Sequence, residues 1–192
     1  MPRIETETLA QHRDWRRNQL IEAAASIALE SGGSAVTVAA VAQRAGLSRT
    51  SVYEYFGSSA DLIADLVLEE LNNFAQYLQE AVAHTEQPVE SIAAWIESAL
   101  TYIADGRHLL AKALNATSLP QERTAAIGSA HRALLAPLVS GLSAMGVKDT
   151  QRALLFIQAI TDASTKRIEG GHDAEAEIKS ATVFCISGLA SI

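Results

Sequence analysis

Glycine and proline residues divide this alanine-rich sequence into segments of helical length, and that division is the strongest constraint on its fold. Alanine is the strongest helix former, whereas glycine and proline end helices. No run alternates β-branched and polar residues as a half-buried strand does. We therefore expect an all-α fold of about nine helices and no sheet. The expected helices cover residues 12–31, 37–44, 48–55, 59–84, 88–105, 107–118, 121–145, 149–169 and 174–190.

The composition is that of a folded chain rather than a disordered or membrane-spanning one. Hydrophobic residues make up 48% of the 192 residues, which excludes a disordered chain. No uncharged apolar run reaches the ~18 residues that a membrane span needs. The first residues lack the apolar core of a signal peptide, and the single Cys185 cannot form an internal disulfide. We expect a cytoplasmic protein with no membrane association.

The net charge of −7 lies in the second part of the chain. Residues 1–60 contain six basic and six acidic residues, whereas residues 61–192 contain nine basic and sixteen acidic residues. A sequence pI of about 5.2 argues against a general polyanion binder. It leaves room for DNA binding by a small local face. Ordinary solvated surface explains the imbalance equally well.

The segment 37–57 has the spacing of a helix-turn-helix. Ala42 is small enough for a second helix to approach closely, and Gly46 can adopt the positive φ that ends the first helix. Leu47 and Val52 are expected to point into a core shared with Val38, Val41 and Phe56. Two helices this short must pack on each other and on the preceding helix.

Polar and aromatic side chains are expected on the outer side of this segment. Ser48 can cap the second helix, which leaves Arg49, Thr50, Ser51, Tyr53 and Tyr55 facing outward. Such a set fits a DNA major groove, where the amino-terminal end of the second helix reads base edges. An ordinary helical hairpin with a polar wet side is the alternative.

Four motifs in order resemble the DNA-binding domain of the tetracycline-repressor (TetR) family. They are Leu-Ile-x-Ala-Ala at 20–24, Val-Ala-x-x-Ala-Gly-Leu-Ser at 41–48, Val-Tyr-x-Tyr-Phe at 52–56, and Asp-Leu at 61–62. The resemblance covers about residues 12–65, and beyond residue 80 only helical character and length match. It implies a helix-turn-helix domain over 1–60, with residues 1–11 as a flexible arm, and a ligand-binding and dimerisation domain over 61–192.

The resemblance also implies which residues contact DNA. Thr37, Arg44 and Tyr55 would touch phosphates, and Ser48, Arg49, Thr50 and Tyr53 would face the groove or its backbone. Arg49 is the best candidate for reading a base. Many members have lysine near the start of the fourth helix, where this chain has Ser58-Ser59. A helix start with hydroxyls, including Ser59, still binds phosphate, although we expect modest affinity.

The second part of the chain is expected to hold a cavity for a small apolar or aromatic ligand. Trp95 and Tyr102 lie seven residues apart on one flank of the fifth helix, whose apolar face includes Ala99 and Ile103. Gln158 and Asp162 lie four residues apart on one helix face. A polar pair amid apolar residues either faces solvent or lines a cavity. Histidines 108, 131 and 172 lack metal-ligand spacing and are interpreted as surface or capping residues.

The last two helices carry small and apolar residues suited to pairing with a second copy. The predicted dimer interface comprises Leu155, Phe156, Ala159, Ala163, Val183, Phe184 and Ser187. Packing within one chain is the alternative. A dimer would place its two DNA-binding domains on half-sites about 34–36 Å apart, or a multiple of that distance.

These observations predict a transcriptional regulator, most simply a repressor. It would bind a palindromic operator as a homodimer and be released by a small molecule. The sequence lacks the phosphate-binding, nucleophile-elbow, zinc-protease and di-iron motifs of enzymes. We expect no enzymatic activity, no cofactor and no metal. The alternative is a helical adaptor that binds protein through its tyrosine-rich face.

Overall fold

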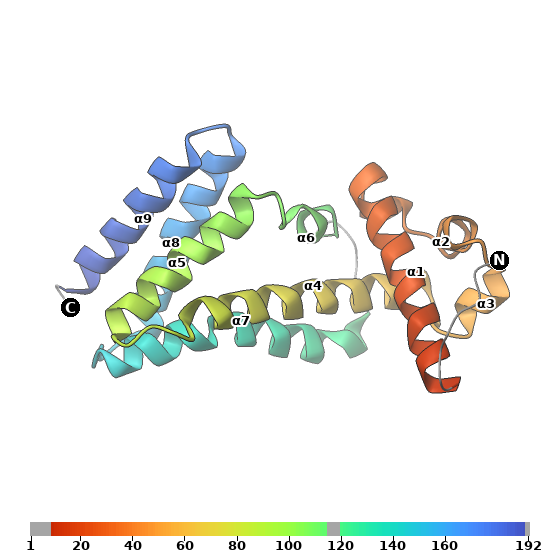
Figure 1. Ribbon diagram of the computed structural model, residues 1–192, viewed down its shortest axis with the longest axis horizontal. Helices are drawn as coiled ribbons and strands as arrows, with labels where there is room; N and C mark the ends of the chain where they lie inside the picture. The colour runs from red at the N-terminus through yellow and green to blue at the C-terminus, as the bar shows by residue number, and fades with distance from the viewer. Residues whose placement is uncertain (1–8, 115–119, 191–192) are drawn as a thin grey trace. The chain divides into compact units, whose positions relative to one another are not determined.

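The computed structural model describes residues 9–114 and 120–190, and within these ranges the chain is helical with no strand (Figure 1). The α-helices are α1 (Leu9–Ser31), α2 (Val38–Ala45), α3 (Arg49–Tyr53), α4 (Ser59–Val82), α5 (Pro88–Ala104), α6 (Leu109–Leu114), α7 (Thr124–Ala144), α8 (Thr150–Glu169) and α9 (Ala174–Leu189). Two 3-10 turns, η1 (Gly33–Ala35) and η2 (Gln121–Arg123), complete the fold. The predicted all-α class is confirmed. None of the described helices is long and apolar enough to cross a membrane.

Helix caps place the short helices where the sequence predicts them. The Thr37 hydroxyl accepts a hydrogen bond from the Ala40 backbone N–H at 3.1 Å and begins α2. Gly46 ends α2 with φ 66°, in the left-handed region that glycine enters without penalty. The Ser48 hydroxyl then accepts from the Ser51 backbone N–H at 3.0 Å and begins α3. These three residues therefore fix the turn between the two helices.

Two predicted helices of the second half, 107–118 and 121–145, differ from the structure in their bounds. The predicted helix 107–118 corresponds to α6, which begins at Leu109, and residues 115–118 of the prediction lie outside the described part. The predicted helix 121–145 begins with the turn η2, and Pro137 lies inside α7 without dividing it. Proline removes one backbone donor. Burial of Leu134, Leu138 and Leu142 on either side of it holds the helix in the core. Of the predicted flexible arm 1–11, residues 1–8 lie outside the described part, and residues 9–11 belong to α1 instead.

The described residues form two compact units. Unit 1 comprises the residues up to Glu70 together with Leu110–Ile127. Figure 1 shows α1 beside α2, which in turn contacts α3. Leu20, Val41, Val52 and Leu62 are fully buried in its core. The core is thus built by α1, the two short helices and the first part of α4.

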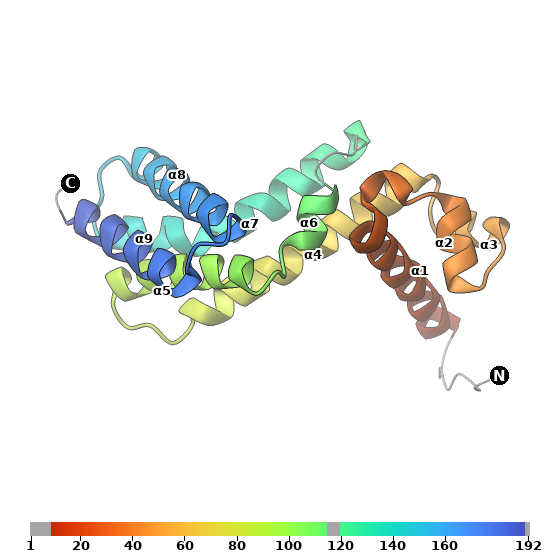
Figure 2. The same cartoon turned by 90° about the horizontal axis from the view of Figure 1, so that it is seen from above.

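Unit 2 comprises Leu71–Leu109 and the residues from Gly128 onward. Helices α5, α8 and α9 pack against one another (Figure 2). Ile92, Ile96, Leu138, Leu142 and Ile157 lie at the centre of a core that α7 and the second part of α4 complete. The predicted domain boundary at residues 60 and 61 stays a prediction, because a compact unit is not by itself an independently folding domain.

Candidate nucleic-acid interface and effector cavity

The apolar residues of α2 and α3 face inward, which leaves the polar residues on the outer side. Val38, Val41, Val52 and Phe56 are buried, and Leu47 packs on the same core while half-buried. The predicted inner face is confirmed. On the other side of these two helices, Arg49, Thr50 and Tyr53 are exposed.

A hollow of about 350 Å³ opens on this outer side, where α2, α3 and α4 meet. It brings together four predicted DNA-binding residues, Thr37, Arg49, Tyr53 and Ser59, which come from three different elements. Arg49 and Tyr53 are exposed on α3. The remaining lining residues are Val38, Ala39, Gly57 and Ser58.

Two helix starts give this hollow an affinity for negative charge. Thr37 caps α2, and the Ser58 hydroxyl caps α4 by accepting from the Asp61 backbone N–H at 3.1 Å. The amino-terminal end of a helix carries a partial positive charge and unpaired N–H groups that bind phosphate. Of the side chains described at this hollow, only that of Arg49 is charged, and it has no ion-pair partner among the described residues.

A nearby carboxylate weakens this attraction. The Ser58 hydroxyl donates to Asp61 Oδ2 at 2.8 Å, which holds the carboxylate close to the start of α4. This negative charge stabilises the helix start but opposes a bound phosphate. The hollow therefore combines one arginine and two helix starts, which attract a phosphate, with the Asp61 carboxylate, which repels it.

Ser48 and Thr50 are exposed near the start of α3 but do not line the hollow. Ser48 is occupied as a cap, and its hydroxyl also lies 3.0 Å from the Ser51 hydroxyl. Their predicted contacts with DNA are neither supported nor opposed by this geometry.

Arg44 and Tyr55 also do not line the hollow, and each contacts another part of unit 1. The Arg44 guanidinium donates two hydrogen bonds to the Glu30 carboxylate, at 2.8 and 2.6 Å. The hydrogen bonds of this pair are the largest cause that lowers the pKa of Glu30 and raises the pKa of Arg44. Tyr55 is half-buried and packs on the unit 1 core rather than facing fully outward.

A second cavity, of about 180 Å³, lies within unit 2 between α4, α5, α7 and α8. Five of the six predicted ligand-binding residues line it: Trp95, Ala99, Ile103, Gln158 and Asp162. Tyr102 does not, because its ring stacks on Phe74 with centroids 4.3 Å apart and lies under the Arg107 guanidinium.

The sequence analysis missed several lining residues of this cavity. Phe74 of α4, Leu134 and His131 of α7, and Thr161 and Thr165 of α8 also line it. Thr161 and Thr165 lie on the same face of α8 as Gln158 and Asp162, at helical spacing. Extending the predicted pair along this face would therefore have identified them from the sequence. Trp95 forms part of the lining while its Nε1–H donates to the Leu134 carbonyl at 2.9 Å.

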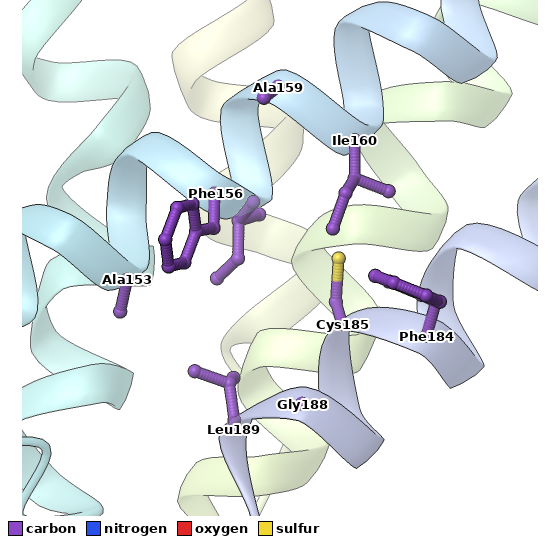
Figure 3. Close-up of a pocket in the computed structure, with 9 residues that line it drawn as sticks. Ala153, Phe156, Ala159, Ile160, Phe184, Cys185, Gly188 and Leu189 are labelled. Carbon is purple, nitrogen blue, oxygen red and sulfur yellow. The ribbon is translucent and has the colours of Figure 1, made fainter. Parts of the chain in front are cut away.

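A third, apolar hollow of about 430 Å³ lies between α8 and α9 (Figure 3). Phe156 and Ile160 border it from α8, and Phe184, Cys185 and Leu189 border it from α9. Burial raises the pKa of the Cys185 thiol to about 11, so the thiolate is scarce near neutral pH. All seven predicted dimer residues are exposed. The side chains of Leu155, Phe156, Val183 and Phe184 are 57–68% exposed.

Sequence comparison identifies relatives of the first part of the chain. The model of the family "Bacterial regulatory proteins, tetR family" matches residues 20–66. The HTH-type transcriptional regulator BetI of Brucella anthropi is 38% identical over 96 residues, covering 50% of this chain and 46% of that protein. The HTH-type transcriptional activator FasR of Mycolicibacterium smegmatis is 28% identical over 91 residues, covering 47% and 42%. The match therefore spans about half the length of each protein.

Structural comparison extends the likeness of fold to most of the chain. The crystal structure of the transcriptional regulator FadR from Bacillus subtilis in complex with stearoyl-CoA superposes with a TM-score of 0.73. The superposition covers 89% of this chain and 98% of that one, at 21% identity. At this identity the likeness concerns the fold alone.

Proposed function

By its residues 20–66 the chain belongs to the tetR family of bacterial regulatory proteins, and we propose that it is a transcriptional regulator that binds operator DNA as a homodimer. In this proposal unit 1 binds the duplex. Unit 2 pairs with a second copy and binds a small molecule that releases the DNA. Repression is the simplest mode, because release by a ligand then turns a gene on.

The hollow at α2, α3 and α4 is the observation that carries the DNA-binding proposal. It gathers Arg49, which has no ion-pair partner in the described part of the chain, an exposed tyrosine and two helix starts at one place. The two helix starts would hold the phosphate backbone. The exposed side of α3, with Arg49, Thr50 and Tyr53, would enter the major groove, where arginine reads guanine best.

The exposed face of α8 and α9 supports the homodimer. Four large apolar side chains stand exposed there next to an apolar hollow, and such patches on a folded chain mark interaction sites. Ala159, Ala163 and Ser187 are small and exposed on the same two helices, which lets helices of a partner approach closely. A two-fold pair would present two copies of unit 1 to a palindromic operator.

Selection of binding sites from random duplex DNA tests this function. We expect a palindromic sequence to be enriched, with half-sites about one helical turn apart or a multiple of it. Arg49→Ala should weaken the enrichment and relax the preference at one base position, whereas Arg132→Ala, which removes an exposed arginine from α7, should leave it unchanged. Failure to enrich any sequence would contradict the proposal and favour a protein-binding adaptor.

A further inference from the structure

We infer that the cavity of unit 2 takes a compact organic cation, with a small aromatic or branched apolar body and an ammonium-type head. The inference rests on the proposed function, because it names the chemical class of the effector. It follows from the size of the cavity and from the charge and hydrogen-bonding state of its lining.

The volume limits the ligand to a single small ring and a short head. The cavity measures about 180 Å³, whereas drug-sized ligands occupy roughly 300–1,000 Å³. An engineered cavity of about 150 Å³ accommodates benzene. A long acyl chain exceeds this space, so the likeness of fold to an acyl-CoA-binding regulator does not carry over to the ligand.

The lining separates into an apolar floor and a polar rim. Trp95, Leu100 and Leu134 are buried and form the floor together with the Phe74 ring. Asp162 and His131 are exposed, and Gln158 and Thr165 are half-buried. An amphipathic ligand would therefore lie with its apolar body on the floor and its head at the rim.

The polar rim is available to a ligand. Within residues 9–114 and 120–190, none of the side chains of His131, Gln158, Asp162 and Thr165 forms a hydrogen bond or ion pair with another part of the protein. By contrast, the Thr161 hydroxyl is shared between the carbonyls of Ile157 and Gln158, both at 3.0 Å. The acceptors of Asp162 and Gln158 therefore have no partner among the described residues where the ligand head would lie.

The charge of the rim selects the sign of that head. Asp162 is the one carboxylate among the described lining residues, and no lysine or arginine accompanies it. Arg132 and Lys166, the nearest cations along α7 and α8, are exposed and do not line the cavity. A ligand carboxylate or phosphate would approach Asp162 without a compensating cation. An ammonium head would donate a charge-assisted hydrogen bond to this carboxylate.

Three probes with one shared ring and chain length, but different heads, test this inference. We would titrate 2-phenylethylammonium, 2-phenylethanol and 3-phenylpropionate near neutral pH. Tryptophan fluorescence is the readout, in a Trp15→Phe background that leaves Trp95 of the cavity floor as the one tryptophan. The ammonium probe should give a saturable change and bind more tightly than the alcohol, and the carboxylate should give none.

Two variants show whether Asp162 supplies the preference. Asp162→Asn removes the charge at an exposed position and should weaken the ammonium probe about tenfold or more, since hydrogen bonds to charged groups carry the larger energies. Glu175→Gln removes an exposed carboxylate from α9 and should leave affinity unchanged. Carboxylate binding as tight as ammonium binding, an unaffected Asp162→Asn variant, or no saturable change with the ammonium probe would each overturn the inference.

Binding of DNA is measured separately and without any probe. A protein that fails to enrich an operator sequence contradicts the proposed regulator, whatever its probe preference. A protein that binds an operator but shows no preference for the ammonium head contradicts the ligand class alone. The two failures are therefore distinguishable.

Discussion

At the scale of single residues, Arg49 is the side chain that we propose reads a base. It is exposed at the start of α3 and lines the same hollow as Thr37 and Tyr53. Arg49→Ala should cost about 1–3 kcal/mol of binding free energy and relax the preference at one base position. Comparing affinities for operators changed one base pair at a time measures this. A loss that is uniform across all sequences would show that Arg49 contacts only a phosphate.

The ion pair between Glu30 and Arg44 gives a prediction about acid titration. Hydrogen bonding to Arg44 holds the pKa of Glu30 below its ordinary value of 4.5. A carboxyl with a depressed folded-state pKa stabilises the fold above its unfolded pKa, and this contribution disappears as the pH falls through the lower folded value. In Arg44→Ala the Glu30 carboxyl should titrate at its ordinary value, as followed by NMR. Identical titration of Glu30 in both proteins would contradict the pair.

Helix caps and ion pairs differ in how far single residues reveal them from the sequence. The Ser48 cap of α3 was predicted from the local sequence, because a capping hydroxyl accepts from a backbone N–H a few residues further along the same helix. The pairing of Arg44 with Glu30 was not, because the partners lie 14 residues apart on different helices. Capping is a local rule, whereas an ion pair across a turn depends on how two helices face each other.

At the scale of elements, Asp65 joins three segments of unit 1. Its carboxylate accepts from Arg17 of α1 at 2.7 Å and pairs with Arg123 of η2 at 3.0 Å, and its side chain is 12% exposed. Asp65→Asn should lower the free energy of unfolding by about 1–3 kcal/mol, because two guanidinium groups lose their counter-charge. Denaturant unfolding measures this. Stability unchanged within error would show that solvent screens the cluster.

Helices α8 and α9 give a prediction about assembly. Phe184 is 68% exposed, so Phe184→Glu leaves the core of the chain intact while placing a charge in the proposed interface. The variant should be monomeric at a concentration where the original protein is dimeric, with an unchanged circular dichroism spectrum. Sedimentation velocity measures this.

A matched control for this variant lies in unit 1. Leu29 is 56% exposed on α1, and Leu29→Glu should leave the dimer unchanged. A monomeric original protein at micromolar concentration, or a dimeric Phe184→Glu variant, would contradict the proposed interface.

The helical pattern predicted the elements better than it predicted the effector cavity. Periodicity places Trp95, Ala99 and Ile103 on one face of α5, and all three line the cavity. Tyr102 follows the same spacing but turns to Phe74 and Arg107 instead. The rotation of a helix about its axis decides which of its residues line a cavity. Packing against neighbouring helices sets that rotation, and the local sequence pattern does not reveal it.

At the scale of the whole molecule, the charge distribution sets the strength of DNA binding. The chain carries a net charge of −7, and the hollow at α2, α3 and α4 has one charged lining side chain beside the nearby Asp61 carboxylate. We therefore expect few phosphate contacts and a slope of log affinity against log salt no steeper than about −6 for the dimer. A titration of binding from low to physiological salt measures the slope. A markedly steeper one would mean that further cations reach the backbone.

The central claim is that the outer side of α2 and α3 reads duplex DNA. Fluorescence anisotropy on the selected duplex, at about 0.15 M salt and with excess random competitor, tests it most directly. The account predicts tight, competitor-resistant binding that Tyr53→Ala abolishes and Arg132→Ala preserves. Binding that random competitor removes, or that Tyr53→Ala leaves intact, would contradict it.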